Sequence, residues 1–210
     1  MGRRDEGGGA AVSEVRAWLV DLDGTLYRPG PVKLRMALAL VLGGARVVPT
    51  LRRFRREHEL LRSELDHDVD SPFLEQVERT ARALGSSPAE VEVIVREWMV
   101  ARPCGHLRRH ARHELLGEIE RFRQSGGQTA LVSDYPARDK LRALEADRLF
   151  DVVVASGEPD GPPRLKPHPA GYLRAAERLG VPPSACLVIG DRDDADGVAA
   201  RRAGMQFRLV

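Results

Sequence analysis

The sequence predicts an α/β fold in which short parallel strands alternate with helices, interrupted once by an all-helical insertion. Two observations lead to this fold class. Apolar runs of four to six residues end at polar or small residues, and helical patterns lie between the later runs. Continuous apolar runs of this length are typical of parallel strands that are buried on both faces. The predicted strands span residues 15–20, 128–132, 151–155, 186–190 and 206–209.

Helical patterns follow the later strands at about 137–146, 168–180 and 195–203. Gly180 and Gly204 lie where the C-caps of the second and third of these helices would fall. Strands that alternate with helices in this way are typical of the doubly wound class, in which helices cover both faces of a parallel sheet.

The stretch between the first and second predicted strands contains helical patterns and no convincing strand. Its amphipathic patterns span about 33–43, 49–64, 73–84 and 88–100, and a helix over 107–124 is expected to return the chain to the sheet. Ser71 and Ser87 each precede a proline, which predicts an N-cap followed by a first-turn proline. The predicted organisation is a disordered tail over 1–13, a core over 14–29 and 108–210, and a helical cap over 30–107.

The composition is that of a soluble globular protein, with 42% apolar and 30% charged residues in a chain of 210. A net charge of +2 is too small to favour nucleic-acid binding. Cys104 and Cys186 lie far apart and outside any metal-binding spacing, so reduced thiols are expected. No signal-peptide core and no membrane-length apolar run occurs, which predicts a cytoplasmic location and no membrane partner. The oligomeric state stays open.

Two carboxylates follow the first predicted strand, at Asp21 and Asp23, and Gly24 and Thr25 come directly after them. Glycine allows a sharp turn over the strand tip, so both acids are expected at the carboxyl end of a strand, where open α/β sheets place their active sites. Close carboxylates repel each other. The pair therefore indicates a cation or an electrophile between them.

Polar residues also follow three later strands. Ser133 ends the second strand, where a serine is usually only a turn residue. Only three lysines occur in the chain (Lys33, Lys140 and Lys166). The last lies between prolines and a following helix, and Pro167 and Pro169 restrict the loop that carries it. The fourth strand is followed by a cluster of acids, of which helix capping would explain one or two but not all. These acids are Asp191, Asp193, Asp194 and Asp196.

Together these motifs resemble those of the haloacid dehalogenase superfamily. Asp21-Leu22-Asp23-Gly24-Thr25 is similar to the first motif, Ser133 to the second, Lys166 to the third, and Gly190-Asp191 with Asp196 to the fourth. The resemblance covers all four motifs in order and implies a Rossmann-like catalytic core. The all-helical insertion is similar to the cap of the phosphoglycolate phosphatase-like and dehalogenase-like branches.

The resemblance implies phosphoryl transfer through an aspartyl-phosphate. Asp21 would be the nucleophile, Asp23 the general acid and base, and Lys166 the cation that neutralises both the nucleophile and the phosphoryl group. Thr25 and Ser133 would bind phosphoryl oxygens. Asp134 is grouped with these substrate-binding residues, although an asparagine is frequent at its position and its side chain is expected to shape the loop.

The charge balance of these motifs calls for Mg²⁺, since several carboxylates and a phosphate face the single ammonium of Lys166. The implied ligands are the carboxylates of Asp21 and Asp191 and the backbone carbonyl of Asp23. Asp196 fits the spacing of the fourth motif better than Asp193 or Asp194, as a water-mediated or orienting partner.

Asp23 favours a phosphate ester as substrate, because dehalogenases of this superfamily lack an acid at that position. The leading hypothesis is a Mg²⁺-dependent phosphatase of the phosphoric monoester hydrolase type, acting on a small phosphorylated metabolite. Two alternatives remain. A phosphomutase would use the same intermediate, and a non-catalytic regulatory protein would be expected to have lost one of the motif residues, of which none is lost here.

Substrate choice is expected to depend on the cap, where the sequence says less. The basic run Arg52-Arg53-Phe54-Arg55-Arg56 is interpreted as an exposed helix face. Residues near the predicted return from cap to core are candidates for contacts with the substrate, namely Arg102, Cys104 and His106. Trp98 and Met99 are assigned to the cap core. The histidines expected to be solvated rather than catalytic are His58, His110 and His113.

Overall fold

The computed structural model describes residues 14–64 and 69–210, so the predicted disordered tail lies outside the described residues. A five-stranded parallel sheet forms its centre, with strand order β3-β2-β1-β4-β5. The predicted fold class is confirmed. The strands are β1 (Ala17–Val20), β2 (Gln128–Ser133), β3 (Val152–Ala155), β4 (Cys186–Gly190) and β5 (Gln206–Leu209).

Strand β1 lies in the middle of the sheet and pairs with β2 on one side and β4 on the other. Val20, its last residue, is in register with Leu131 and Ile189. The chain adds β2 and β3 on one side of β1 and then crosses to add β4 and β5 on the other. The strand order therefore reverses at β1 and β4, and the crevice at such a reversal is where open α/β sheets bind ligands.

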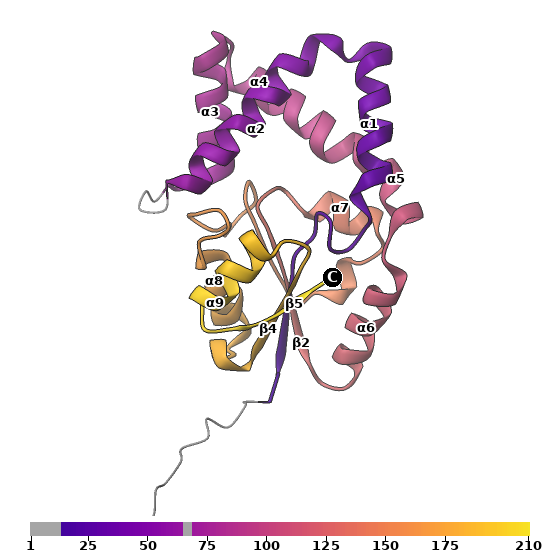
Figure 1. The fold of residues 1–210 in the computed structure, drawn as a ribbon, viewed down its shortest axis with the longest axis vertical. Coiled ribbons are helices and arrows are strands. Elements are labelled where there is room, and N and C mark those ends of the chain that lie inside the picture. Colours follow the sequence, from indigo (N-terminus) through magenta and orange to yellow (C-terminus); the bar gives the residue numbers. More distant parts are fainter. Residues whose placement is uncertain (1–13, 65–68) are drawn as a thin grey trace, which may run out of the picture.

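Helices cover both faces of the sheet (Figure 1). Alternate residues of β1 point to opposite faces, so that Leu19 belongs to the core under one layer and Val20 to the core under the other. Burial of these apolar side chains on both faces is the main stabilising contribution to the sheet. One layer holds α8 (Ala170–Leu179) and α9 (Val198–Arg202), and the other holds α6 (His113–Gln124) and α7 (Arg138–Ala143).

The first five helices between β1 and β2, which precede α6, lie beyond the carboxyl ends of the strands (Figure 1). They enclose a small core of their own that includes Phe54 and Phe73, with Trp98 and Met99 packed against it. Ser71 and Ser87 act as N-caps, as predicted, because their hydroxyls accept backbone hydrogen bonds. The helices are α1 (Pro29–Gly43), α2 (Val48–Ser63), α3 (Pro72–Leu84), α4 (Pro88–Val95) and α5 (Arg102–Leu107), with a π-helical segment over Arg96–Ala101.

The prediction of one continuous helix over 107–124 is wrong. A 3₁₀ turn follows α5, and Ala111 is extended and forms an antiparallel bridge with Tyr27 before α6 begins. The Arg28 N–H donates to the His110 carbonyl at 2.9 Å, and the Arg112 N–H donates to the Leu26 carbonyl at 2.8 Å. These backbone groups are used between segments, so they cannot continue a helix. The two connections to the helical insertion therefore run side by side.

Helix α1 leaves several apolar side chains exposed, and the most exposed are Leu34, Val41 and Leu42. Within the described ranges, no single helix is long and apolar enough to cross a membrane. By length and composition alone, α1 passes that test together with the segment Ala45–Ser63, from which it is bent by 108°.

Candidate functional site

Asp21 lies at the carboxyl end of the central strand, where its N–H donates to the Ile189 carbonyl at 2.9 Å. The chain then turns over the strand tip through Gly24, whose φ of +107° is a conformation that side chains with a Cβ rarely adopt. A Cβ on Gly24 would lie 2.0 Å from Oδ2 of Asp191. Glycine is thus required both by the turn and by the close approach of Asp191, which follows β4.

Lys166 lies at the centre of the site. Its Nζ donates to Oδ1 of Asp21 at 2.5 Å and to Oδ1 of Asp196 at 2.8 Å. The ammonium and both carboxylates are buried. The hydroxyl of Thr25 donates to Oδ2 of Asp21 at 2.9 Å, and the hydroxyl of Tyr172 donates to Oδ1 of Asp196 at 2.7 Å. Residues distant in the sequence therefore form one buried polar cluster.

Three carboxylates of this cluster could hold a metal ion. Asp21, Asp191 and Asp196 each offer one oxygen, and these oxygens lie within 4.8 Å of one another. Asp194 lies outside the group, because its side chain is 67% exposed and pairs with Arg192 at 2.5 Å. Asp193 is also exposed and pairs with Arg201. The structure thus brings Asp196 to the site and leaves its two acidic neighbours at the surface.

Burial raises the pKa values of Asp21 and Asp191. Desolvation raises the pKa of Asp21 to about 7, although the ammonium of Lys166 opposes the shift, and the charge of Asp196 adds to it. Burial and the charge of Asp196 also raise the pKa of Asp191. Burial works to lower the pKa of Lys166, but Asp196 and Asp21 hold it well above its usual value. The lysine therefore stays charged, and its single positive charge does not balance the three carboxylates.

We expect the titration of Asp21 to destabilise the metal-free protein as the pH rises from about 4 to about 7. Folded Asp21 keeps its proton up to pH about 7, whereas unfolded Asp21 releases it near pH 3.8. The folded state binds more protons between these values, so the free energy of unfolding falls with rising pH. Melting temperatures measured in EDTA test this. The slope should be shallower in Asp21→Asn and unchanged in the exposed control Asp139→Asn, and equal slopes in all three proteins would contradict the assignment.

Ser133 and Asp134 follow β2 at the same edge of the sheet. Ser133 is buried, and its hydroxyl accepts the N–H of Tyr135 at 3.2 Å. Oδ1 of Asp134 accepts the backbone N–H of Lys166 at 3.1 Å. Asp134 therefore ties the loop after β2 to the loop that carries the lysine.

The Asp23 carboxylate has a different set of partners from that of Asp21. Nζ of Lys140 donates to both of its oxygens at 2.7 Å, and the Tyr27 hydroxyl donates to Oδ1 at 2.5 Å. Lys140 is buried on α7. Sequence reasoning counted Lys166 as the one cation of the motifs and missed Lys140. The scarcity of lysine was the available signal, because only three occur in the chain.

Helix α2 brings two basic side chains to the core. Nε of Arg62 donates to the Lys166 carbonyl at 2.8 Å. His58 is buried and stacks on Tyr135 with ring centroids 4.7 Å apart, and its Nε2 lies 3.9 Å from Oδ2 of Asp134. Desolvation lowers the pKa of His58. The prediction that His58 is solvated is wrong, because α2 packs this face against the loop after β2.

The other residues singled out in the helical region contact their own neighbours, although the charges of Lys140 and Asp23 act on the thiol of Cys104. Arg102 packs over the Trp98 ring at 4.1 Å and pairs with Glu97. Cys104 donates to the Val100 carbonyl, His106 is half-buried, His110 is half-buried and His113 is exposed. In the basic run, Phe54 is buried and the arginines on either side of it point outward or pair with Glu57, which agrees with an exposed helix face.

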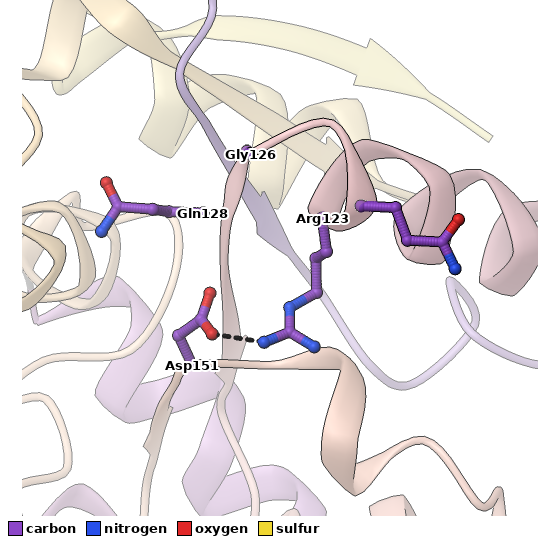
Figure 2. A pocket seen from close by; sticks show the side chains of 6 residues that line it. Arg123, Gly126, Gln128 and Asp151 are labelled. Carbon is purple, nitrogen blue, oxygen red and sulfur yellow. Dashed lines mark hydrogen bonds and ion pairs between the residues drawn. The ribbon is translucent and has the colours of Figure 1, made fainter.

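A hollow of about 560 Å³ lies at the opposite end of the sheet (Figure 2). It is bordered by the end of α6 and the start of β2, and Arg123 pairs with Asp151 across it at 2.5 Å. Asp151 also accepts the N–H of Thr129 at 2.9 Å. Its two charged groups are thus paired with each other and lie at the amino-terminal ends of the strands. The hollow is therefore no candidate for the reaction.

The site consists of a buried lysine between carboxylates, at the carboxyl ends of parallel strands. These features define an α/β protein with an acidic centre of the kind found in active sites. The model of the haloacid dehalogenase-like hydrolase family matches residues 15–204. The chain belongs to this family and is a hydrolase.

A phosphoglycolate phosphatase of Xanthomonas campestris is 28% identical over 204 residues, which cover 90% of this chain and 80% of that protein. The structure of a 2-haloacid dehalogenase from Pseudomonas syringae is similar with a TM-score of 0.61 and 20% identity, over 93% of this chain and 86% of the other. A β-phosphoglucomutase from Clostridium difficile aligns with a TM-score of 0.54 and 19% identity, over 92% and 83%. At such identities the two structures show a shared fold alone.

Proposed function

We propose that this hydrolase is a Mg²⁺-dependent phosphatase that cleaves a small phosphate ester through an aspartyl-phosphate on Asp21. The observation that carries the proposal is the contact of Lys166 with Asp21 and Asp196 beside Asp191. A phosphoglycolate phosphatase aligns with 90% of this chain at 28% identity, and this likeness supports a phosphate monoester as the substrate class.

The charges of the site support a divalent cation. Three carboxylates face one ammonium, and the net charge of minus two that remains is balanced by one dication. The donors are all hard oxygens, which suit Mg²⁺. Asp21 and Asp191 would bind the ion through their carboxylates and Asp23 through its backbone carbonyl, while Asp196 would orient this set. When bound, the ion would neutralise phosphate charge beside Asp21.

The side chains of the site would divide the reaction between them. An oxygen of Asp21 forms a bond to phosphorus while the bond from phosphorus to the leaving oxygen breaks, and the leaving oxygen takes the electron pair and a proton from Asp23. Water then attacks phosphorus, gives its proton to Asp23, and the bond to Asp21 breaks. Thr25, Ser133 and Lys166 would hold the phosphoryl oxygens throughout.

The presence of Asp23 also helps to distinguish a phosphatase from the alternative activities of a dehalogenase and a phosphomutase. Departure of a halide needs no proton, so an acid at this position favours an ester over a haloacid. A phosphomutase would return the phosphoryl group of Asp21 to a second hydroxyl, and the shared fold with a β-phosphoglucomutase keeps this second candidate open. Turnover that depends on an added bisphosphate would identify a mutase.

We also propose that residues 30–107 act as a cap that selects the substrate over a core formed by 14–29 and 108–210. Arg62 and His58 support this, because they reach from α2 to the loops that carry Lys166 and Asp134. The leaving group of the ester would lie between these loops and the cap.

We expect hydrolysis of part of a phosphorylated-metabolite panel, phosphoglycolate included, in the presence of Mg²⁺, and its loss in EDTA. Mg²⁺ should also raise the melting temperature of the wild type, and this shift should shrink in Asp196→Asn and persist in the matched variant Asp194→Asn. Activity that survives chelation would contradict the metal requirement. A Mg²⁺ shift that is lost in Asp194→Asn and kept in Asp196→Asn would reverse the choice between these acids.

A further inference from the structure

The carboxylate of Asp23 is held by Lys140 of the core helix α7 and by Tyr27, which lies at the connection to the cap. We propose that Lys140 is a positioning residue for Asp23, with Tyr27 as its partner, and that these contacts orient the acid toward the leaving oxygen. The inference rests on the proposed function, since it assigns a role within the same reaction.

The geometry of the Lys140 contact fixes the carboxylate in two directions. Nζ lies 2.7 Å from both Oδ1 and Oδ2, so one donor group spans the carboxylate and restrains its rotation about the bond to Cβ. An exposed lysine pair rarely holds such a geometry, because its long side chain keeps its freedom. Here the lysine side chain is only 5% exposed, and packing of α7 against the sheet limits its movement.

The exposures of the two partners point to a role beyond fold stability. The Asp23 side chain is 28% exposed, whereas the side chain of its partner Lys140 is buried. An ammonium is costly to bury, and a pair that served the fold alone could be replaced by apolar side chains. The arrangement places a fixed positive charge beside an acid that remains partly exposed.

Tyr27 links the same carboxylate to the connection between core and cap. Its hydroxyl donates to Oδ1 of Asp23, and its backbone forms the bridge with Ala111. The carboxylate is thus held by one donor from α7 and one from the segment that leads to the cap.

The leaving-group dependence of kcat/KM tests this role. Breaking the ester bond sends the electron pair to the leaving oxygen, and a phenolate needs a proton from Asp23 far more than a p-nitrophenolate does. In Lys140→Met, kcat/KM for phenyl phosphate with Mg²⁺ should fall about 10²-fold, and that for p-nitrophenyl phosphate less than about tenfold. Tyr27→Phe should show the same difference more weakly, and Lys140→Arg should restore part of the activity on phenyl phosphate.

Lys33→Met is the matched control, because Lys33 is exposed on α1 and should leave both substrates unaffected. Equal losses on both substrates in Lys140→Met and Tyr27→Phe would mean that the pair is structural and would overturn the inference. If Lys140→Met fails to fold, an unaltered leaving-group dependence in Tyr27→Phe would overturn it as well. A wild type that hydrolyses neither ester with Mg²⁺ would instead overturn the proposed function, and the inference with it.

Discussion

Asp21→Asn should abolish phosphatase activity while the protein stays folded, with kcat reduced by at least about 10⁴-fold, as expected for loss of a covalent nucleophile. The amide has nearly the same shape as the carboxylate and can still accept from Thr25, so the turn over the strand tip should persist. Its nitrogen cannot form the acyl phosphate. The measurement is steady-state turnover of the best substrate of the panel with saturating Mg²⁺.

A second acid of the same region gives the control for this variant. Asp193→Asn removes one negative charge near the site, but Asp193 is exposed and pairs with Arg201 at the surface. Its turnover should stay close to that of the wild type. Activity in Asp21→Asn near the wild-type level would sink the covalent mechanism, whereas equal losses in both variants would indicate an effect of net charge rather than of the nucleophile.

Lys166→Met should lower both activity and stability. Removing the ammonium leaves the carboxylates of Asp21 and Asp196 buried without their shared partner, which typically costs about 3–5 kcal/mol of unfolding free energy. Loss of a charge aimed at the phosphoryl group should reduce kcat by about 10³-fold. Urea unfolding at pH 7 and pH 5 measures the first effect, which should be smaller at pH 5 because Asp21 is then protonated.

The double variant Lys166→Met/Asp196→Asn separates the two effects. Stability should recover in part, because one of the buried unpaired charges is removed and the interaction energy between the two residues is large. Activity should stay low, because the ammonium is still missing. Additive losses of stability in the double variant would show that Lys166 and Asp196 do not act as the buried pair described above. Unchanged activity in Lys166→Met would exclude the lysine from phosphoryl binding.

The strand-end residues could be predicted from the sequence because a local pattern places them. An apolar run that stops at Asp21 or at Asp191 gives the end of a buried strand, and parallel strands bring such ends to one edge of a sheet. The same reasoning gave the sheet and its helices. It failed at Ala111, where backbone pairing with a segment far away in the sequence interrupts a helical pattern.

Contacts that depend on packing between distant helices could not be predicted. Lys140 lies within an ordinary amphipathic helix pattern, and its partner Asp23 is 117 residues away. His58 lies on a polar stretch of α2, and only the approach of α2 to the loop after β2 buries it against Tyr135. Nothing local distinguishes such side chains from solvated ones, since their surroundings are set by tertiary structure.

The paired connections at Tyr27 and Ala111 join the helical region to the core at one narrow crossing. Backbone hydrogen bonds between the two connections close that crossing. The entropy of closing a loop grows only with the logarithm of its length. The entropy of closing the loop formed by the helical region therefore changes little when that region is lengthened or shortened.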